Sequence, residues 1–199
     1  MAYMKVITGP MFSGKTEELL RVLRRSELAE KRVIVFKPSI DVRTDNEIVS
    51  RGQHDMSRRE FKKTGSYPAF PIRSAQEALS IIYEHQPTVI GIDEAQFFDV
   101  WLPEFLAELL EKFSGSDLLI VAAGLDMDAW RRPFGIMPQL FAMADEVQKE
   151  TAVCFVCKAR PALFTQKLVD SKEQVQVGDA EIYEARCRVC HELPKTRLL

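Results

Sequence analysis

The sequence lacks any strong excess of charge, because 27 basic side chains are balanced by 29 acidic ones and the formal net charge is −2. A chain with so little net charge has no global field that attracts DNA, RNA or an anionic membrane, so we expect no nucleic-acid partner. Long apolar runs are also missing: no stretch approaches the roughly 18 residues of a membrane span, and the first apolar run is too short for a signal peptide. We therefore expect a cytoplasmic protein without a membrane partner.

Cysteine is absent from the first three quarters of the chain. The four cysteines form two Cys-x-x-Cys pairs, Cys154 with Cys157 and Cys187 with Cys190. In an intracellular enzyme this pattern indicates metal ligation rather than disulfide bonding. Four thiolates leave no open coordination position, so we expect a structural Zn²⁺ ion. His191 is a further candidate ligand, although a surface position is the simpler interpretation.

Strand-like and helix-like apolar patterns alternate along the chain. Strands are predicted at 5–8, 32–36, 88–92 and 118–122, and helices at 15–30, 74–85 and 101–113, the second helix with Ser74 and Glu77 at capping-box spacing. Such alternation is typical of a parallel sheet covered on both faces. The stretch from 39 to about 71 has no strong period and is predicted to be a long, irregular excursion. Because the composition changes near Ala152, we expect a core over 1–150 and a small second domain over 151–199 that needs a staple to fold.

A glycine-rich motif lies between the first predicted strand and the first predicted helix. Glycines allow the backbone to curl so that successive N–H groups point at phosphate oxygens, while a lysine adds positive charge and a threonine offers a hydroxyl to Mg²⁺. The motif predicts a P-loop that binds ATP and Mg²⁺. It consists of Gly9, Pro10, Met11, Phe12, Ser13, Gly14, Lys15 and Thr16.

An acidic pair, Asp93 and Glu94, ends the third predicted strand. Parallel sheets bind ligands at the carboxyl ends of their strands, so this pair is expected beside the phosphates. Asp93 is suited to hold the hydration shell of Mg²⁺, and Glu94 to accept a proton from the group that attacks the γ-phosphate. The pair alone leaves open whether that group is water or a substrate hydroxyl. A GTPase is disfavoured because the sequence has no Asn-Lys-x-Asp motif.

Taken together, these motifs resemble the type II thymidine kinases, a zinc-containing and tetrameric family. The resemblance implies an α/β fold with a RecA-like P-loop core and a C-terminal zinc-stapled lasso. It also implies a homotetramer that transfers the γ-phosphate of ATP to the 5′-hydroxyl of thymidine or deoxyuridine with Mg²⁺. It covers nearly the whole chain and rests on the P-loop, Phe36-Lys37-Pro38 with Asp41-Val42-Arg43, Asp93 to Phe98, Gly124-Leu125-Asp126, Arg132 to Gly135, Thr165 to Leu168, and Tyr183 to Cys187.

The resemblance also implies roles for individual residues. Glu94 matches the general base, and Lys15, Thr16 and Asp93 match the residues that serve the phosphates and metal, with Gln96 beside them. Nucleoside contacts are expected from the remaining matched positions. These are Phe97, Leu125, Phe134, Thr165 and Tyr183, and the lasso residues Gln174, Val175, Gln176, Val177 and Gly178.

Three features depart from the usual family pattern. Ala129 stands where a phenylalanine packs on the nucleoside, with Trp130 beside it, and Lys167 replaces an arginine. The segment between Cys157 and Cys187 is also shorter than in many relatives. Two other functions stay open: a P-loop ATPase in which Glu94 activates water, and a zinc-ribbon interaction module whose ATP site only switches its shape. Nucleoside-dependent ADP formation separates the kinase from both.

Overall fold

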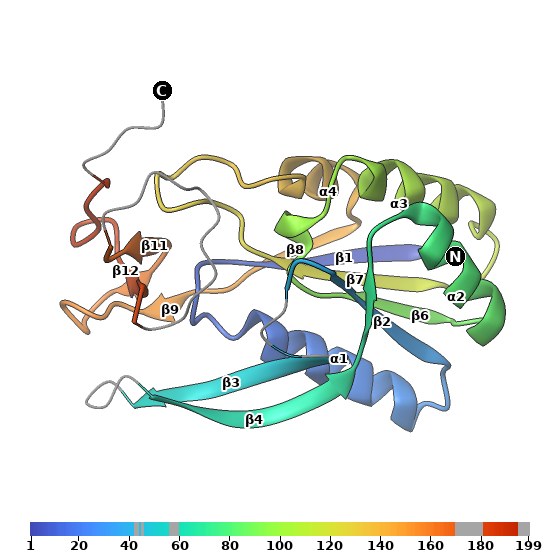
Figure 1. Ribbon diagram of the computed structural model, residues 1–199, viewed down its shortest axis with the longest axis horizontal. Helices are drawn as coiled ribbons and strands as arrows, with labels where there is room; N and C mark the ends of the chain where they lie inside the picture. The colour runs from blue at the N-terminus through green and yellow to red at the C-terminus, as the bar shows by residue number, and fades with distance from the viewer. Residues whose placement is uncertain (42–43, 45, 56–59, 170–180, 195–199) are drawn as a thin grey trace.

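A six-stranded parallel sheet forms the centre of the computed structural model, which describes residues 1–41, 44, 46–55, 60–169 and 181–194 (Figure 1). The strand order is β5-β2-β6-β7-β1-β8, and each neighbouring pair is parallel. The predicted α/β class with a parallel sheet is therefore confirmed. The strands are β1 (Tyr3–Thr8), β2 (Val33–Pro38), β5 (Phe70–Ile72), β6 (Val89–Ile92), β7 (Leu119–Gly124) and β8 (Glu146–Lys149).

Both faces of the sheet are covered, which explains why its strands are apolar throughout. Neighbouring residues of β1 serve opposite faces: Val6 belongs to one buried cluster and Ile7 to the other. The first cluster lies under α2 (Ala75–His85), α3 (Trp101–Lys112) and α4 (Met137–Met143), and the second under α1 (Lys15–Leu28) (Figure 1). None of the helices in the described ranges is long and apolar enough to cross a membrane.

The predicted irregular excursion is wrong. β3 (Glu47–Asp55) and β4 (Glu60–Pro68) form an antiparallel hairpin that lies along α1, and β5 joins the edge of the sheet (Figure 1). Ile48 and Ala69 are buried in the α1 cluster, and the Tyr67 hydroxyl donates to Glu27 Oε1 at 2.7 Å. Most of the hairpin sequence is polar, so its strands show no alternating apolar pattern. Their pairing depends instead on contacts with α1.

Short antiparallel strands follow the central sheet. β9 (Ala152–Val153) pairs with β10 (Pro161–Ala162), and β11 (Phe164–Lys167) pairs with β12 (Tyr183–Arg186). Figure 1 places this segment beside the carboxyl end of β1, at one end of the central sheet. Its small buried cluster consists of Ala152, Cys154, Ala162, Ala185 and Cys187. The lasso positions Gln174, Val175, Gln176, Val177 and Gly178 lie outside the described residues, as does Arg43.

Helix α2 begins with a side-chain cap. Ser74 Oγ accepts a hydrogen bond from the Glu77 N–H at 3.3 Å, as the capping-box spacing predicts, while Glu77 Oε2 accepts from the Arg73 N–H at 2.7 Å. The cap therefore satisfies an N–H group that the helix itself leaves without a partner.

Ser74→Ala should lower the free energy of unfolding by about 1 kcal/mol, because it removes this cap. Urea denaturation followed by circular dichroism measures the loss. Ser80→Ala, at an exposed position inside the same helix, is the control and should leave stability unchanged or slightly higher. Equal stability of both variants would mean that the cap contributes nothing.

Candidate active site

The phosphate loop between β1 and α1 has an unusual backbone. Gly9, Phe12 and Gly14 have positive φ angles of 141°, 65° and 84°. A Cβ atom at Gly9 would lie 2.4 Å from Glu150 O, so a larger residue does not fit there. Gly14, in the left-handed conformation, is the N-cap of α1. This geometry brings the positive end of α1 to the carboxyl edge of the sheet, where it can bind an anion.

The polar side chains at this edge come from α1 and β6. Lys15 Nζ donates to Pro10 O at 2.7 Å and so lies over its own loop. Thr16 Oγ1 lies 3.4 Å and 3.3 Å from the two carboxylate oxygens of Asp93, which follows β6 and is buried. A hydroxyl and a carboxylate at this spacing can share a hydrated Mg²⁺ ion with phosphate oxygens.

Glu94 is held beside Asp93 in a left-handed conformation, with φ 50° and ψ 42°. This conformation is uncommon for a residue with a side chain, and it recurs at active sites. Gln96 Nε2 donates to Glu94 Oε2 at 2.6 Å, and Gln96 Oε1 accepts from the Leu125 N–H at 2.9 Å. The buried amide of Gln96 therefore orients the Glu94 carboxylate and ties it to the loop after β7.

Close packing fixes Gln96 in turn. A Cβ atom at Gly135, which has φ 51°, would lie 2.3 Å from Gln96 O, and one at Gly124 would lie 2.8 Å from Gln96 Oε1. Phe97 and Phe134 pack edge to face with ring centroids 5.7 Å apart. The structure thus brings Gln96 and Phe97 of the acidic motif together with Phe134 and Gly135 of the later motif.

The loop after β7 is shaped by Asp128. Its Oδ1 accepts from the backbone N–H groups of Trp130 at 2.9 Å and Arg132 at 3.0 Å. Ala129 and Trp130 are both 7% exposed, so neither is a surface residue. Lys167 Nζ lies 5.6 Å from the centroid of the Trp130 ring. The Trp130 indole therefore lies inside this loop, where its ring faces the ammonium group of Lys167 in β11.

Strands β11 and β12 carry two predicted nucleoside contacts. Thr165 and Tyr183 are both buried, and Tyr183 is paired with Lys167 across the two strands. Thr165 Oγ1 accepts a hydrogen bond from the Met11 N–H at 3.0 Å. One predicted substrate position is thus in direct contact with the phosphate loop.

One ion pair at the same edge was not predicted from the sequence. Lys149 Nζ lies 2.6 Å from Asp126 Oδ2, and Asp126 is buried. These residues follow β7 and end β8, the strands on either side of β1. Because parallel pairing rather than local sequence makes them neighbours, no spacing rule points to the pair.

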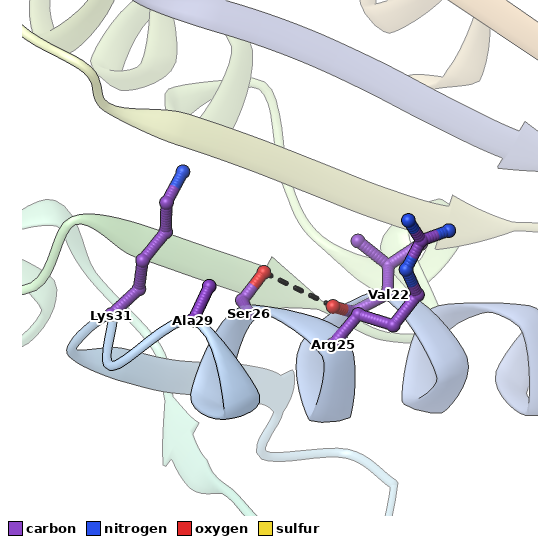
Figure 2. A pocket seen from close by; sticks show the side chains of 5 residues that line it. All are labelled: Val22, Arg25, Ser26, Ala29 and Lys31. Carbon is purple, nitrogen blue, oxygen red and sulfur yellow. Dashed lines mark hydrogen bonds between the residues drawn. The ribbon is translucent and has the colours of Figure 1, made fainter.

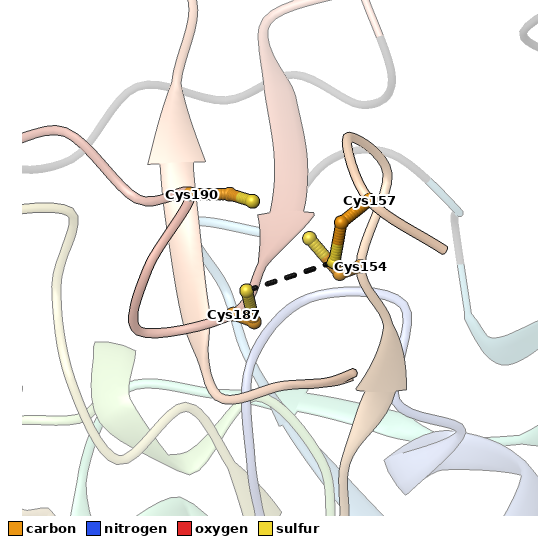
Figure 3. Close-up of side chains that lie close together, drawn as sticks. All are labelled: Cys154, Cys157, Cys187 and Cys190. Carbon is orange, nitrogen blue, oxygen red and sulfur yellow. Dashed lines mark hydrogen bonds between the residues drawn. The ribbon is translucent and has the colours of Figure 1, made fainter. Parts of the chain in front are cut away.

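The four cysteines form one cluster, with their side chains directed toward one another from two turns (Figure 3). All four sulfur atoms lie within 4.8 Å of one another, as the tetrahedral coordination of one ion requires. Burial alone raises the pKa of the Cys154 thiol, but backbone hydrogen bonds from Cys157 and Cys187 outweigh it and lower that pKa to about 6. A hydrogen bond with Cys187, together with burial, raises the pKa of Cys190 to about 12. A cation bound by the four sulfurs would replace their protons.

His191 is not the surface residue that the sequence suggested. It is 6% exposed, and it does not belong to the group of possible metal ligands among the described residues. Burial, and then the charge of Arg131, lower the pKa of its imidazole. Arg131 lies 60 residues earlier in the sequence, so only the fold identifies its contact with His191.

A separate small pocket lies on the C-terminal half of α1 (Figure 2). It has a volume of about 260 Å³ and is lined by Val22, Arg25, Ser26, Ala29 and Lys31, with Ser26 Oγ donating to Val22 O at 3.0 Å. None of the predicted site residues lines it. Since the phosphate loop precedes the opposite end of α1, this pocket is distinct from the site described above.

Comparison with known proteins agrees with this geometry. Residues 2–191 match the family model described as thymidine kinase. The chain is also 41% identical over 198 residues to a thymidine kinase of Coprothermobacter proteolyticus, an alignment that covers 96% of this chain and 91% of that protein. The phosphate loop, the acidic pair and the clustered cysteines thus belong to an enzyme that phosphorylates thymidine, and the chain is a member of the thymidine kinase family.

Proposed function

We propose that the chain transfers the γ-phosphate of ATP to the 5′-hydroxyl of thymidine or deoxyuridine, with Glu94 as the general base. The observation that carries this proposal is the double contact of Gln96. Its amide orients the Glu94 carboxylate on one side and holds the Leu125 N–H on the other. The Glu94 carboxylate is therefore connected to the loop after β7, which carries Leu125, one of the residues expected to bind the nucleoside.

The triphosphate is held by the phosphate loop in this proposal. Backbone N–H groups from Phe12 to Thr16 and the positive end of α1 would face the phosphate oxygens, and Lys15 would exchange its contact with Pro10 O for a phosphate. Thr16 and Asp93 would hold Mg²⁺, which screens the charge of the triphosphate when bound.

The chemical step is an in-line transfer. The 5′-hydroxyl gives its proton to the Glu94 carboxylate as its oxygen forms a bond to the γ-phosphorus. The bond from that phosphorus to the β–γ bridging oxygen breaks, and ADP leaves with the electron pair. Lasso residues Gln174 to Gly178, with Thr165 and Tyr183, would cover the nucleoside and exclude water, which keeps the phosphate from being lost by hydrolysis.

The pocket walls are assigned by the same reasoning. Phe97, Leu125 and Phe134 are proposed to line the nucleoside site, and the edge-to-face contact of the two phenylalanines supports this. Trp130 is buried beside Ala129 and supplies aromatic surface to the loop in which the family usually has phenylalanine.

The cysteine cluster is proposed to hold one structural Zn²⁺ through Cys154, Cys157, Cys187 and Cys190. The mutual sulfur distances support this, and so does the small buried cluster around the cysteines, which offers little apolar area of its own. We further propose a core over 1–150 and a lasso domain over 151–199, because the composition changes near Ala152. On the strength of the family resemblance, we also propose a homotetrameric assembly and a cytoplasmic location.

Glu94→Gln should lower turnover by roughly 10²- to 10⁴-fold, because it keeps the side-chain volume and removes the base. Affinity for ATP should change by no more than about a few fold, since the triphosphate is held by other groups. Turnover at saturating thymidine and ATP titration measure the two effects. Glu108→Gln, on the exposed side of α3, is the matched control. Undiminished turnover of Glu94→Gln would refute its role as base.

Gln96→Leu should lower turnover by roughly 10-fold or more, because Glu94 loses the hydrogen bond that orients it. The Michaelis constant for thymidine should rise as well, since the Leu125 N–H loses its acceptor. Gln96→Glu keeps an acceptor for that N–H but repels Glu94, so it should restore the Michaelis constant and not the turnover. A Michaelis constant for thymidine that rises equally in both variants would contradict this division of roles.

Cys187→Ser should remove stoichiometric Zn²⁺ and lower the unfolding temperature, because three thiolates hold the ion less tightly than four. Elemental analysis and thermal unfolding check the two effects. Metal content and stability equal to those of the unchanged protein would refute the zinc assignment.

A further inference from the structure

The phosphate loop contacts the cysteine-bearing segment at two neighbouring residues. The Phe12 ring packs against the small cluster of Cys154 and Cys187, and its centroid lies 6.2 Å from that of Phe155. The Met11 N–H donates to Thr165 Oγ1 at 3.0 Å. The conformation of the loop is therefore supported from outside, by residues that lie between Cys154 and Cys187 in the chain.

His191 lies behind Thr165. Its Nε2 is 3.2 Å from Thr165 O, and its ring packs on the Phe164 ring with centroids 5.2 Å apart. Its backbone N–H donates to Cys187 O at 3.0 Å, so the residue is part of the turn that carries the second cysteine pair. One buried side chain thus joins that turn to the strand that contacts the phosphate loop.

Arg131 holds His191 from the core. Its Nε donates to His191 Nδ1 and its Nη2 to His191 O, both at 3.1 Å, and its guanidinium lies 4.5 Å from the centroid of the Phe164 ring. Because Arg131 donates to Nδ1, that nitrogen must be an acceptor, and Nε2 carries the proton that is donated to Thr165 O. Arg131 has φ 62°, a conformation that persists only where contacts fix it.

We propose that His191 is a positioning residue that couples the cysteine turn to the phosphate loop through β11 and the Thr165 hydroxyl. The phosphate loop has three positive φ angles, so without the Thr165 contact it samples other conformations and loses preorganisation for its ligand. The affinity for ATP should therefore depend on Thr165 and His191 even when no nucleoside is present. This inference rests on the proposed role of the loop in binding ATP.

Titration with MgATP in the absence of nucleoside tests the hydrogen bond between the Met11 N–H and the Thr165 hydroxyl. Thr165→Val keeps the shape of the side chain and removes the hydroxyl, so the dissociation constant should rise about three- to tenfold, the usual effect of one lost hydrogen bond. Thr165→Ser keeps the hydroxyl and should stay within about twofold of the unchanged protein. Omitting the nucleoside separates this effect from any contact of Thr165 with the base.

His191→Phe tests the earlier contacts, because it keeps an aromatic ring on Phe164 and removes both ring nitrogens. It should weaken MgATP binding while its zinc content stays that of the unchanged protein. Combined with Thr165→Val, it should cause no more loss than Thr165→Val alone, since both changes interrupt the same path. Arg188→Met is the matched control: Arg188 also lies over the Phe164 ring, at 5.0 Å, but it is exposed.

Two results overturn the inference: an unchanged dissociation constant for Thr165→Val, or an unchanged one for His191→Phe with full zinc content. If His191→Phe loses the metal, Arg131→Met replaces it, because Arg131 lies outside the cysteine segment. Unchanged MgATP binding by Arg131→Met then refutes the coupling. Failure of the unchanged protein to bind MgATP would instead refute the proposed function.

Discussion

The candidate active site depends on how the strained loop between β1 and α1, the proposed phosphate loop, is held in place. An anion cradle needs backbone N–H groups that point in one direction, and here it uses positive φ at Gly9, Phe12 and Gly14. Phe12 has a side chain, so its conformation costs of order 1 kcal/mol or more unless surrounding contacts offset it. The Glu150 N–H donates to Thr8 O before the loop, and Thr165 accepts from Met11 within it. The loop is thus shaped by the segment after β8 as much as by its own sequence.

Local backbone conformation also positions the proposed catalytic pair, Asp93 and Glu94, which follows β6. Asp93 directly follows the last residue of β6 and lies against Thr16, while Glu94, the next residue, has left the extended conformation. The left-handed conformation of Glu94 turns the chain into the short η1 helix (Ala95–Phe97), from which Gln96 reaches back to the Glu94 carboxylate. Two adjacent carboxyl groups thereby acquire different partners, a hydroxyl for one and an amide for the other. This difference allows one to serve a metal and the other a proton.

Sequence reasoning identified the parts of the fold in which local pattern and tertiary structure agree. The strand before Gly9, the helix from Lys15, the Ser74 cap and the apolar strand before Asp93 were all predictable, because their signals are short-range. The β3–β4 hairpin was missed because its polar strands are stabilised by α1 rather than by an alternating pattern. β8 was missed because it is a short edge strand with largely exposed side chains, defined by its pairing with β1. Both misses have the same physical origin: non-local pairing leaves little trace in a single segment.

The candidate site divides in the same way. Residues such as Lys15, Asp93 and the cysteines belong to motifs whose residue types and spacing indicate a function, so they can be identified from the sequence. Residues that orient others, such as Arg131 and His191, have no motif, because their partners lie far away in the chain and only the fold makes them neighbours. The small cysteine-bearing segment has too little apolar surface to fix its own position against the core, and directional contacts of buried polar side chains can supply that position. In our proposal, a zinc ion bound by the four cysteines stabilises their turns, while the aromatic and polar side chains beside them set where β11 meets the phosphate loop.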